Sequence, residues 1–325
     1  MAHPVKWAIM STANINRTVI PGAHASPKVE LGAVASRDQA RAAEYAKTWE
    51  IPRAYGSYEA LLSDPVVEAV YISLPNSMHC EWAIKALEVG KHVLCEKPLS
   101  RHPSEVEAAF DVADRTGRLL SEAFMYRHNP QTKRAKQLVD EGVIGELRLI
   151  RSAFSYSLYD EDNIRLSAAL DGGALMDIGC YAVSGSRLFG GEPAKVYGDA
   201  WVGPTGTDWV FAGMLRFPGN VVALFDCGTA MTVRDELEAI GSEGSLFLDD
   251  PWHCTTPGIE LRRDGRVERI EIDVVDSYRL ELENLSDAIR GEGELLLRRD
   301  DAVAQARVLE ALHESAMHGR PVSLM

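Results

Sequence analysis

The feature that most constrains the fold is a regular alternation of short apolar runs and helical segments over the first 125 residues. The runs predict strands: Val5–Met10, Val29–Ala35, Ala69–Leu74, His92–Cys95 and Leu119–Glu122. Helical patterns separate them, one ending near His24 and the others spanning Asp38–Trp49, His79–Val89 and Ser104–Thr116. Strands that are apolar on both faces and alternate with helices indicate a parallel sheet covered on both sides. We therefore expect a doubly wound domain with a ligand crevice at the carboxyl ends of its strands.

The limits of these helices are predicted from residues that favour helix ends. Asp38 and Ser104 are expected as N-caps, because their short side chains accept hydrogen bonds from the first backbone N–H groups of a helix. Gly90 and Gly117 are expected to end two of the helices, since glycine adopts the left-handed conformation without strain.

The pattern changes after about residue 125. Pro130–Glu141 predicts a helix, and Tyr278–Arg290 and Asp300–Gly319 predict two more near the end. Between them, runs separated by Gly, Pro and Asp turns predict strands: Glu146–Ser157, Ala194–Val202, Trp209–Phe217, Val221–Gly228, Glu236–Ile240, Gly244–Leu248, Ile259–Arg262 and Arg266–Ile272. We expect two domains, residues 1–125 and 126–325, with the last helices able to return to the first. The second would be an α+β domain with one mainly antiparallel sheet.

The charge of the chain restricts its partners. Its 325 residues suit about two domains, and 34 Lys and Arg against 48 Asp and Glu give a net charge of −14. Nucleic acids and anionic membranes need a surplus of positive charge, so neither is an expected partner. An anionic small ligand is still compatible, because a few local cations and helix N-termini can hold it.

Several simple features point to a reduced cytoplasm. No apolar run approaches the ~18 residues of a membrane-spanning helix, and Met1–Lys6 lacks the features of a signal peptide. The five cysteines are scattered without a CxxC pair: Cys80, Cys95, Cys180, Cys227 and Cys254. The nine histidines do not cluster either, so no metal is expected.

The turn after the first predicted strand is a weak candidate for dinucleotide binding. Such a turn would carry G-x-G-x-x-G, but Ser11, Ala13 and Asn16 stand at the glycine positions. Small residues still let a backbone approach a pyrophosphate, and Ser11 or Thr12 can cap the following helix. Judged alone, the turn fits an ordinary strand–turn–helix at least as well.

The second predicted strand ends in Ser36-Arg37-Asp38. A cofactor with a free ribose 2′-hydroxyl favours an acidic residue at this place, whereas a 2′-phosphate favours Arg beside a small hydroxyl residue. Ser36 and Arg37 therefore favour NADP if the domain binds a dinucleotide. The alternative is a solvated Arg37 with Asp38 capping the next helix.

The next two strand ends hold further candidates. Ser73-Leu74-Pro75-Asn76, with His79 after it, would shape a loop over the crevice, although it also reads as a plain turn. Lys97, in Glu96-Lys97-Pro98, would project into the crevice, where a desolvated ammonium binds ribose hydroxyls and lowers the pKa of a neighbouring acid. Taken alone, Glu96 and Lys97 fit a surface ion pair better.

The second half has one candidate, Gly172-Gly173 leading through Asp177 to Tyr181. Asp177 and Tyr181 are four residues apart and would share one face of a helix. An acid and a phenol presented together can bind and deprotonate an alcohol. The alternative is that Asp177 favours the helix dipole while Tyr181 packs in the core.

Taken together, these motifs resemble the Gfo/Idh/MocA oxidoreductase family, the glucose–fructose oxidoreductase and inositol dehydrogenase group. The motifs that carry the resemblance are Ser73-Leu74-Pro75-Asn76 with His79, Glu96-Lys97-Pro98, Glu122 through Arg127, and Gly172-Gly173 through Tyr181. They occur in the family's order and at family-like spacing, over nearly the whole chain. The resemblance implies an N-terminal doubly wound Rossmann domain and a C-terminal α+β domain with an open-faced, mainly antiparallel sheet.

The resemblance also implies roles for single residues. Lys97, Tyr181 and Asp177 would be catalytic. The residues expected to bind the cofactor are Ser11, Thr12, Ala13, Asn14, Ile15, Ser36, Arg37, Leu74, Pro75, Asn76, His79, Glu96 and Lys97. Those expected to bind the substrate are Tyr126, Arg127, Tyr156, Asn163, Arg165, Asp177 and Tyr181.

The chain departs from the family pattern at two places. Its first turn lacks the usual glycines, and Tyr181 stands where many members have His. A tyrosine there resembles the subgroup that includes glucose–fructose oxidoreductase, dimeric dihydrodiol dehydrogenase and NADP-dependent xylose dehydrogenase. That subgroup tends to use NADP, which agrees with Ser36 and Arg37.

We expect an NADP-dependent oxidoreductase that moves a hydride between the nicotinamide and a hydroxyl-bearing carbon of a sugar or polyol-like substrate. Tyr181 would be the acid/base, and Lys97 would lower its pKa from the ~10 of a free phenol. Two alternatives are an NAD-dependent dehydrogenase for a ring hydroxyl of an inositol or glycoside, and a non-catalytic dinucleotide-binding sensor. The open sheet, an oligomer interface in this family, implies a homodimer or homotetramer.

Overall fold

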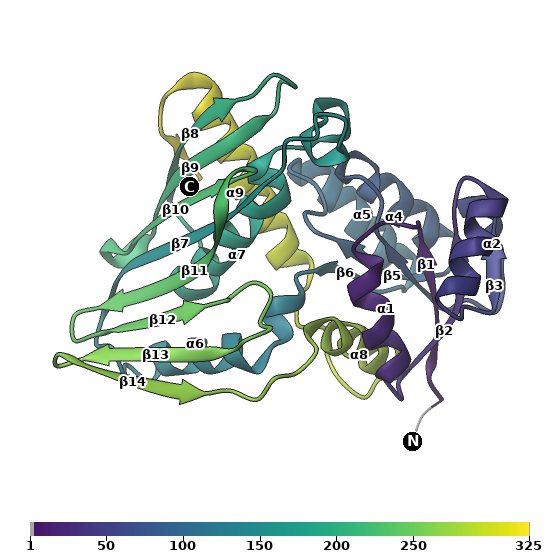
Figure 1. The fold of residues 1–325 in the computed structure, drawn as a ribbon, viewed down its shortest axis with the longest axis horizontal. Coiled ribbons are helices and arrows are strands. Elements are labelled where there is room, and N and C mark those ends of the chain that lie inside the picture. The colour runs from purple at the N-terminus through teal and green to yellow at the C-terminus, as the bar shows by residue number, and fades with distance from the viewer. Residues whose placement is uncertain (1–2, 325) are drawn as a thin grey trace. The chain divides into compact units, whose positions relative to one another are not determined.

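The computed structural model describes residues 3–324, which divide into two units. The first unit contains the chain up to Met125 together with Tyr278–Val303, and the second contains Tyr126–Ser277 and the chain from Ala304 onward. Figure 1 shows the helices and strands of both units, coloured along the chain from purple at the N-terminus to yellow at the C-terminus.

The first unit is built on a six-stranded parallel sheet with the strand order β3-β2-β1-β4-β5-β6. Its strands are β1 (Val5–Met10), β2 (Val29–Ala35), β3 (Arg53–Tyr55), β4 (Ala69–Ile72), β5 (His92–Glu96) and β6 (Leu120–Ala123). The strand order reverses direction between β1 and β4, which is where ligands bind in open α/β sheets. The predicted doubly wound domain is therefore confirmed.

Helices connect these strands: α1 (Asn16–Ala25), α2 (Gln39–Thr48), α3 (Tyr58–Leu62), α4 (His79–Glu88) and α5 (Pro103–Thr116). Asp38 caps α2 as predicted, because its Oδ1 accepts a hydrogen bond from the Arg41 backbone N–H at 2.7 Å. Gly117 ends α5 in the left-handed conformation, also as predicted.

One predicted cap is wrong. Helix α5 begins at Pro103, with His102 at the N-cap position, so Ser104 lies inside the first turn. Proline is favoured at the first helical position, because an N–H there has no partner within the helix and the fixed φ angle of proline is already helical. The backbone preference of Pro103 therefore sets the N-cap two residues earlier than predicted.

The division of the chain differs from the predicted segments 1–125 and 126–325, because Tyr278–Val303 belongs to the first unit. Helix α8 (Ser277–Arg290) buries Leu282 and Leu285 in the same hydrophobic cluster as residues of β1. The indole Nε1 of Trp7 donates a hydrogen bond to Ser286 Oγ at 3.1 Å. The apolar stripe of α8 is thus covered by the core of the first 125 residues.

The second unit holds a nine-stranded sheet with the order β14-β13-β12-β11-β7-β10-β9-β8-β15. Its strands are β7 (Leu147–Ser157), β8 (Lys195–Val202), β9 (Asp208–Arg216), β10 (Val222–Gly228), β11 (Ala230–Gly241), β12 (Ser245–Asp249), β13 (Gly258–Arg263), β14 (Arg266–Glu271) and β15 (Val322–Ser323). Neighbouring strands are antiparallel except for β7 and β10, which run parallel. The sheet is mainly antiparallel, as predicted.

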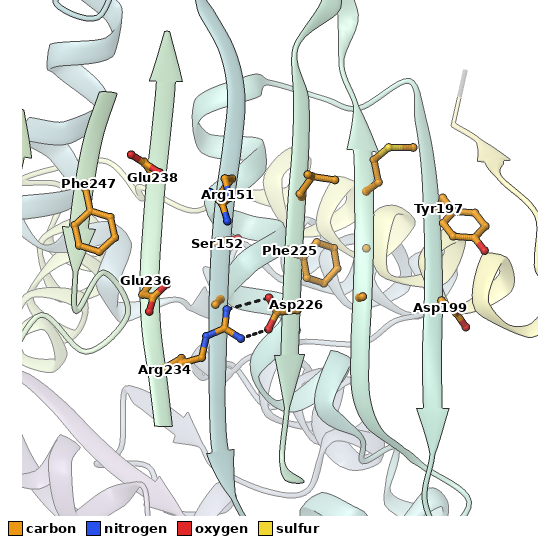
Figure 2. Close-up of a pocket in the computed structure, with 15 residues that line it drawn as sticks. Arg151, Ser152, Tyr197, Asp199, Phe225, Asp226, Arg234, Glu236, Glu238 and Phe247 are labelled. Carbon is orange, nitrogen blue, oxygen red and sulfur yellow. Dashed lines mark hydrogen bonds and ion pairs between the residues drawn. The ribbon is translucent and has the colours of Figure 1, made fainter. Parts of the chain in front are cut away.

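The two faces of this sheet differ. Helix α7 (Cys180–Gly190) packs against β7 and β10, and α6 (Pro130–Asp140) lies against β13. Helix α9 (Arg299–His318) meets β8, where Ser315 Oγ accepts a hydrogen bond from the Gly198 N–H at 3.0 Å. The opposite face carries a groove of about 560 Å³, shown in Figure 2, whose lining includes Arg151, Tyr197, Met214, Leu224, Glu236 and Phe247.

All five cysteines are buried free thiols. Burial raises the pKa of the Cys95 and Cys227 thiols well above the ordinary value, and such thiols are poor nucleophiles. Within residues 3–324, no helix has the length and apolar character needed to cross a bilayer.

Candidate active site

The strands on either side of the reversal point, β1 and β4, lead into two serines that contact each other. Ser11 Oγ lies 2.8 Å from Ser73 Oγ and donates to the Ser73 carbonyl oxygen at 2.9 Å. The Ala13 N–H donates to Ser11 Oγ at 3.1 Å. Ser11 has a φ of 137°, a value that favours glycine. These hydrogen bonds thus stabilise Ser11 in a backbone conformation that ordinarily favours glycine.

Asn16, which is fully buried, completes this turn. Its Nδ2 donates to the Ser11 carbonyl oxygen at 3.0 Å, and its Oδ1 accepts from Ser73 Oγ at 2.7 Å. Helix α1 begins at Asn16 without a side-chain N-cap. The positive end of the helix dipole therefore lies at the reversal point, which suits a phosphate group.

The end of β2 presents an exposed cation. Ser36 is buried and its Oγ accepts from the Asp38 N–H at 3.4 Å, whereas Arg37 is exposed. The carboxylate of Asp38 is engaged in capping α2. The charge presented at this strand end is therefore the positive charge of Arg37.

The loops after β4 and β5 are joined by His79. This buried side chain has Nδ1 2.8 Å from the Pro98 carbonyl oxygen and Nε2 2.8 Å from the Leu74 carbonyl oxygen. Burial and the nearby charge of Lys97 lower its pKa, against the effect of the two carbonyl groups. Lys97 itself is half-buried and is joined to Pro98 by a cis peptide bond. Two segments predicted to bind the cofactor are thereby held together.

Glu96 supports the same strand end from within the core. It is buried, and its Oε1 accepts a hydrogen bond from the Tyr71 hydroxyl. Burial and the Glu96 carboxylate raise the pKa of Tyr71 well above its ordinary value, so this phenol stays protonated. The other carboxylate oxygen of Glu96 accepts from the Lys97 N–H at 3.3 Å. The predicted contact of Glu96 with cofactor stays a prediction.

Asp177 and Tyr181 lie where a π-helical turn, Leu175–Gly179, leads into α7. The sequence predicted a regular helix here, since a π turn has no composition of its own. Asp208 Oδ2 accepts from the Leu175 N–H at 2.6 Å, and a side chain at Gly173, whose φ is 120°, would overlap the Asp208 carboxylate. Inserted π turns are frequent at functional sites, because they turn side chains away from the regular helix positions.

Asp177 is the centre of a polar cluster. The Tyr156 hydroxyl donates to Asp177 Oδ2, and Arg165 Nε lies 3.3 Å from Asp177 Oδ1. Asn163 Oδ1 accepts from the Arg165 N–H at 3.1 Å and so orients the backbone of this segment. Burial and the Asp177 carboxylate raise the pKa of Tyr156, which therefore acts as a hydrogen-bond donor. The structure brings these four predicted residues together.

Tyr181 is surrounded by aromatic rings. Its ring centroid lies 5.5 Å from that of Phe154, 5.9 Å from that of Tyr126 and 6.0 Å from that of Trp252. Tyr126 is almost fully buried and its hydroxyl donates to Ser184 Oγ at 2.8 Å, which Arg127 also approaches at 3.4 Å. Tyr126 therefore packs behind Tyr181, and its predicted contact with substrate stays a prediction.

Sequence reasoning missed several residues of this site. Ser73 lies inside the predicted strand Ala69–Leu74 and was named only as part of a loop motif, so its contact with Ser11 was not predicted. Phe154 had a usable signal, since it falls in the alternating pattern of β7. Trp252 and Asp208 had none, because only the folded sheet brings them beside Tyr181 and Leu175. Lys97 and Tyr181 belong to different units.

Two family models match this chain. Residues 5–124 match the oxidoreductase family with an NAD-binding Rossmann fold, and residues 132–247 match the GFO/IDH/MocA C-terminal domain.

Proteins of similar sequence and structure match most of this chain. The chain is 39% identical to D-xylose 1-dehydrogenase (NADP(+)) 2 of Haloferax volcanii, over 98% of this chain and 99% of that protein. It is 34% identical to human trans-1,2-dihydrobenzene-1,2-diol dehydrogenase, over 78% of this chain and 76% of that one. A crystal structure of a 3-ketoreductase from Actinomadura kijaniata, with NADP and TDP-benzene, superposes with a TM-score of 0.91 at 30% identity, covering 96% of this chain and 98% of that one.

Proposed function

Because this chain belongs to the Gfo/Idh/MocA oxidoreductase family, we propose that it oxidises a hydroxyl-bearing carbon of a sugar or polyol-like substrate with NADP, or reduces the corresponding carbonyl. The observation that carries the proposal is the similarity, over almost the whole of both chains, to a D-xylose 1-dehydrogenase that uses NADP. The test is NADP-dependent turnover by the purified protein across a panel of aldoses and polyols. Cofactor binding without any turnover would favour a dinucleotide sensor instead.

The first unit suits NADP on its own geometry. The turn of Ser11 and Ala13 carries no large side chain, and the uncapped start of α1 favours a phosphate. Arg37 is exposed directly after β2, where Ser36 provides a small hydroxyl residue. We propose that Arg37 and Ser36 bind the 2′-phosphate, and that the predicted residues of the β1, β4 and β5 ends bind the rest of the cofactor. When bound, NADP⁺ would accept a hydride from the substrate, and NADPH would supply one in the reverse direction.

Side chains of the protein would carry out the proton transfer. We propose that Tyr181 removes the proton of the substrate hydroxyl during oxidation and returns it during reduction. A free phenol, with a pKa near ~10, is a poor base at neutral pH, and the positive charge of Lys97 would favour the phenolate. Asp177, held by Tyr156 and Arg165, would accept a hydrogen bond from a second substrate hydroxyl and orient it.

Replacing Arg37 with Ala should raise the KM for NADP about 10–100-fold and change the KM for NAD little. The reason is that a hydrogen bond to a charged group contributes roughly 1.5–3 kcal/mol, and every 1.4 kcal/mol is about tenfold in affinity. Steady-state kinetics with both cofactors measures this, and the matched control is Arg41→Ala, which removes an exposed arginine in the first turn of α2. A native protein that prefers NAD would contradict the assignment of Arg37.

We also propose that the open face of the second unit's sheet binds a second copy of the chain. Leu224 and Met214 are exposed there, 44% and 37%, beside both acidic and basic side chains (Figure 2). A two-fold axis places one face against itself, and a face that carries both signs of charge with exposed apolar groups can complement itself.

This association predicts a native dimer in sedimentation velocity, or a larger oligomer built from it, and a shift to the 35.7 kDa monomer in Leu224→Glu. A buried unpaired carboxylate at the centre of the interface would oppose association. Val274→Glu is the matched control, because Val274 is 72% exposed and lies outside the groove. A native protein that sediments as a monomer would disprove the interface.

A further inference from the structure

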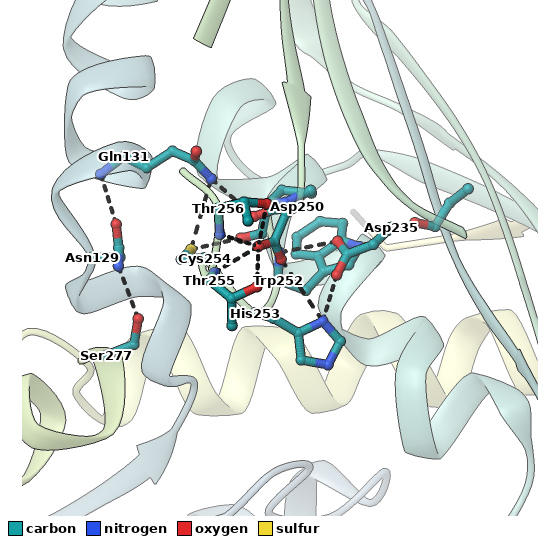
Figure 3. Close-up of polar contacts among 12 residues, drawn as sticks. Asn129, Gln131, Asp235, Asp250, Trp252, His253, Cys254, Thr255, Thr256 and Ser277 are labelled. Carbon is teal, nitrogen blue, oxygen red and sulfur yellow. Dashed lines mark hydrogen bonds and ion pairs between the residues drawn. The ribbon is translucent and has the colours of Figure 1, made fainter. Parts of the chain in front are cut away.

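The loop that follows β12 is held in a single, strained conformation. Asp250 and Cys254 have φ values of 93° and 54°, which non-glycine residues rarely adopt. Asp250 Oδ2 accepts hydrogen bonds from the backbone N–H groups of Thr255 at 2.6 Å and Thr256 at 2.8 Å (Figure 3). The loop is therefore ordered by its own side chains.

Trp252 fixes the loop to the sheet. It is fully buried, and its indole Nε1 donates to the Ala153 carbonyl oxygen at 3.1 Å. Its backbone N–H donates to Asp235 Oδ1 at 3.2 Å. The next residue, His253, is consequently presented from a rigid support although its side chain is 53% exposed.

His253 forms a pair with Asp235. Its Nδ1 lies 2.5 Å from Asp235 Oδ2, as Figure 3 shows, and the Asp235 side chain is only 15% exposed. Burial raises the pKa of Asp235, and the hydrogen bond from His253 acts against that rise. A carboxylate that accepts from Nδ1 sets both the tautomer and the orientation of an imidazole.

This pair stands beside the aromatic cluster of Tyr181. Asp235 is opposite Phe154 in the β7–β11 register, so both side chains lie on the face that α7 covers. The Phe154 ring is 5.3 Å from the His253 ring and 5.5 Å from the Tyr181 ring. Tyr156, which bonds Asp177, is two residues further along β7 and lies on the same face. Polar groups therefore flank one aromatic cluster on two sides.

We propose that His253, whose Nδ1–H is held by Asp235, accepts at Nε2 a hydrogen bond from a hydroxyl of the sugar substrate and thereby contributes to the choice of sugar. The proposal rests on the proposed function, since it needs the substrate beside Tyr181. Small-molecule sites combine apolar and aromatic walls with a few oriented polar groups, and the Phe154 cluster with the His253–Asp235 pair has this composition.

The same residues offer a different chemistry that the test must separate. Asp235, Asp250 and His253 place one ligand atom each within 4.8 Å of one another, a spacing compatible with a metal ion. Asp235, however, already uses both carboxylate oxygens, accepting from the Trp252 N–H and from His253 Nδ1. We therefore assign the pair to direct recognition of a hydroxyl group.

The kinetic test uses D-xylose and NADP with three variants. His253→Ala should raise the KM for D-xylose about tenfold, the effect of one lost hydrogen bond of ~1.4 kcal/mol, with kcat within about twofold of native. His253→Gln, whose side-chain amide oxygen can accept a hydrogen bond, should recover part of this loss. His318→Ala, which removes an exposed histidine of α9, should have the native KM. An unchanged KM in His253→Ala, or a fall in kcat alone, would overturn the proposal.

A binding test separates this inference from the proposed function. The nine histidines are labelled with carbon-13, and the His253 resonance is assigned by its loss in His253→Ala. Titration of the NADP-bound protein with D-xylose should move this resonance to saturation and leave that of His318 in place. If the His253 resonance moves to saturation but the protein shows no turnover, catalysis is disproved and the recognition role of His253 is kept. If the protein turns over D-xylose but the resonance does not move, the recognition role is disproved and catalysis is kept. If EDTA treatment abolishes xylose binding and Zn²⁺ restores it, the residues form a metal site and the proposed recognition by His253 is wrong.

Discussion

Lys97→Met should lower kcat for sugar oxidation with NADP by about 10²–10⁴-fold, the range that proton-transfer catalysis provides. Methionine keeps an unbranched, flexible side chain at the end of β5 but removes the positive charge. In the proposed mechanism this charge favours the phenolate of Tyr181, so little phenolate would form near neutral pH without it. Steady-state kinetics over a range of pH measures both the loss and an upward shift of the pH optimum.

The control for this prediction is Lys47→Met, which removes an exposed lysine at the end of α2. Both variants should keep the native circular dichroism spectrum and nearly the native melting temperature. A Lys97→Met protein that turns over at close to the native rate would show that Lys97 does not assist proton transfer.

Tyr181→Phe should have a comparable effect on kcat, about 10²–10⁴-fold, with the KM for NADP close to native. The variant keeps the aromatic ring, so its packing with Phe154, Tyr126 and Trp252 is preserved and only the hydroxyl is lost. Loss of kcat without loss of cofactor affinity would then report the chemical role of the hydroxyl.

Tyr197→Phe is the matched control, because Tyr197 lies on the open face of the sheet. Combining Tyr181→Phe with Lys97→Met gives a second check. If both residues serve one proton transfer, the double variant should be little worse than either single variant, since effects of residues that act as a unit are not additive. Multiplied losses would show that they act in separate steps.

Most strands of both sheets could be predicted because they bury at least one face, as the fully buried β4 and the alternating β9 show. The apolar run predicted as His92–Cys95 became β5 (His92–Glu96), and the alternating run Glu146–Ser157 became β7 (Leu147–Ser157). β3 and α3 escaped because three and five residues are too few to show a period. The π turn Leu175–Gly179 escaped for another reason, since its residues show no pattern that separates it from a regular helix.

The site could be predicted only as far as it follows strand ends. Ser11, Arg37 and Lys97 could be predicted as candidates because each follows a parallel strand, and the carboxyl ends of parallel strands meet at one edge. Contacts between distant segments gave no signal. The pairing of His253 with Asp235 depends on a loop that Trp252 holds against the sheet. The sequence shows neither the conformation of this loop nor the hydrogen bond of Trp252.

The return of α8 to the first unit also orders events during synthesis. The first 125 residues leave the ribosome without the helix that supplies Leu282 and Leu285 to their core. At roughly 5–20 residues per second, the remainder of the first unit follows about 10–40 s later, after the whole segment Tyr126–Ser277 has been made. The N-terminal unit, although translated first, therefore completes its core only once most of the second unit's sheet has emerged.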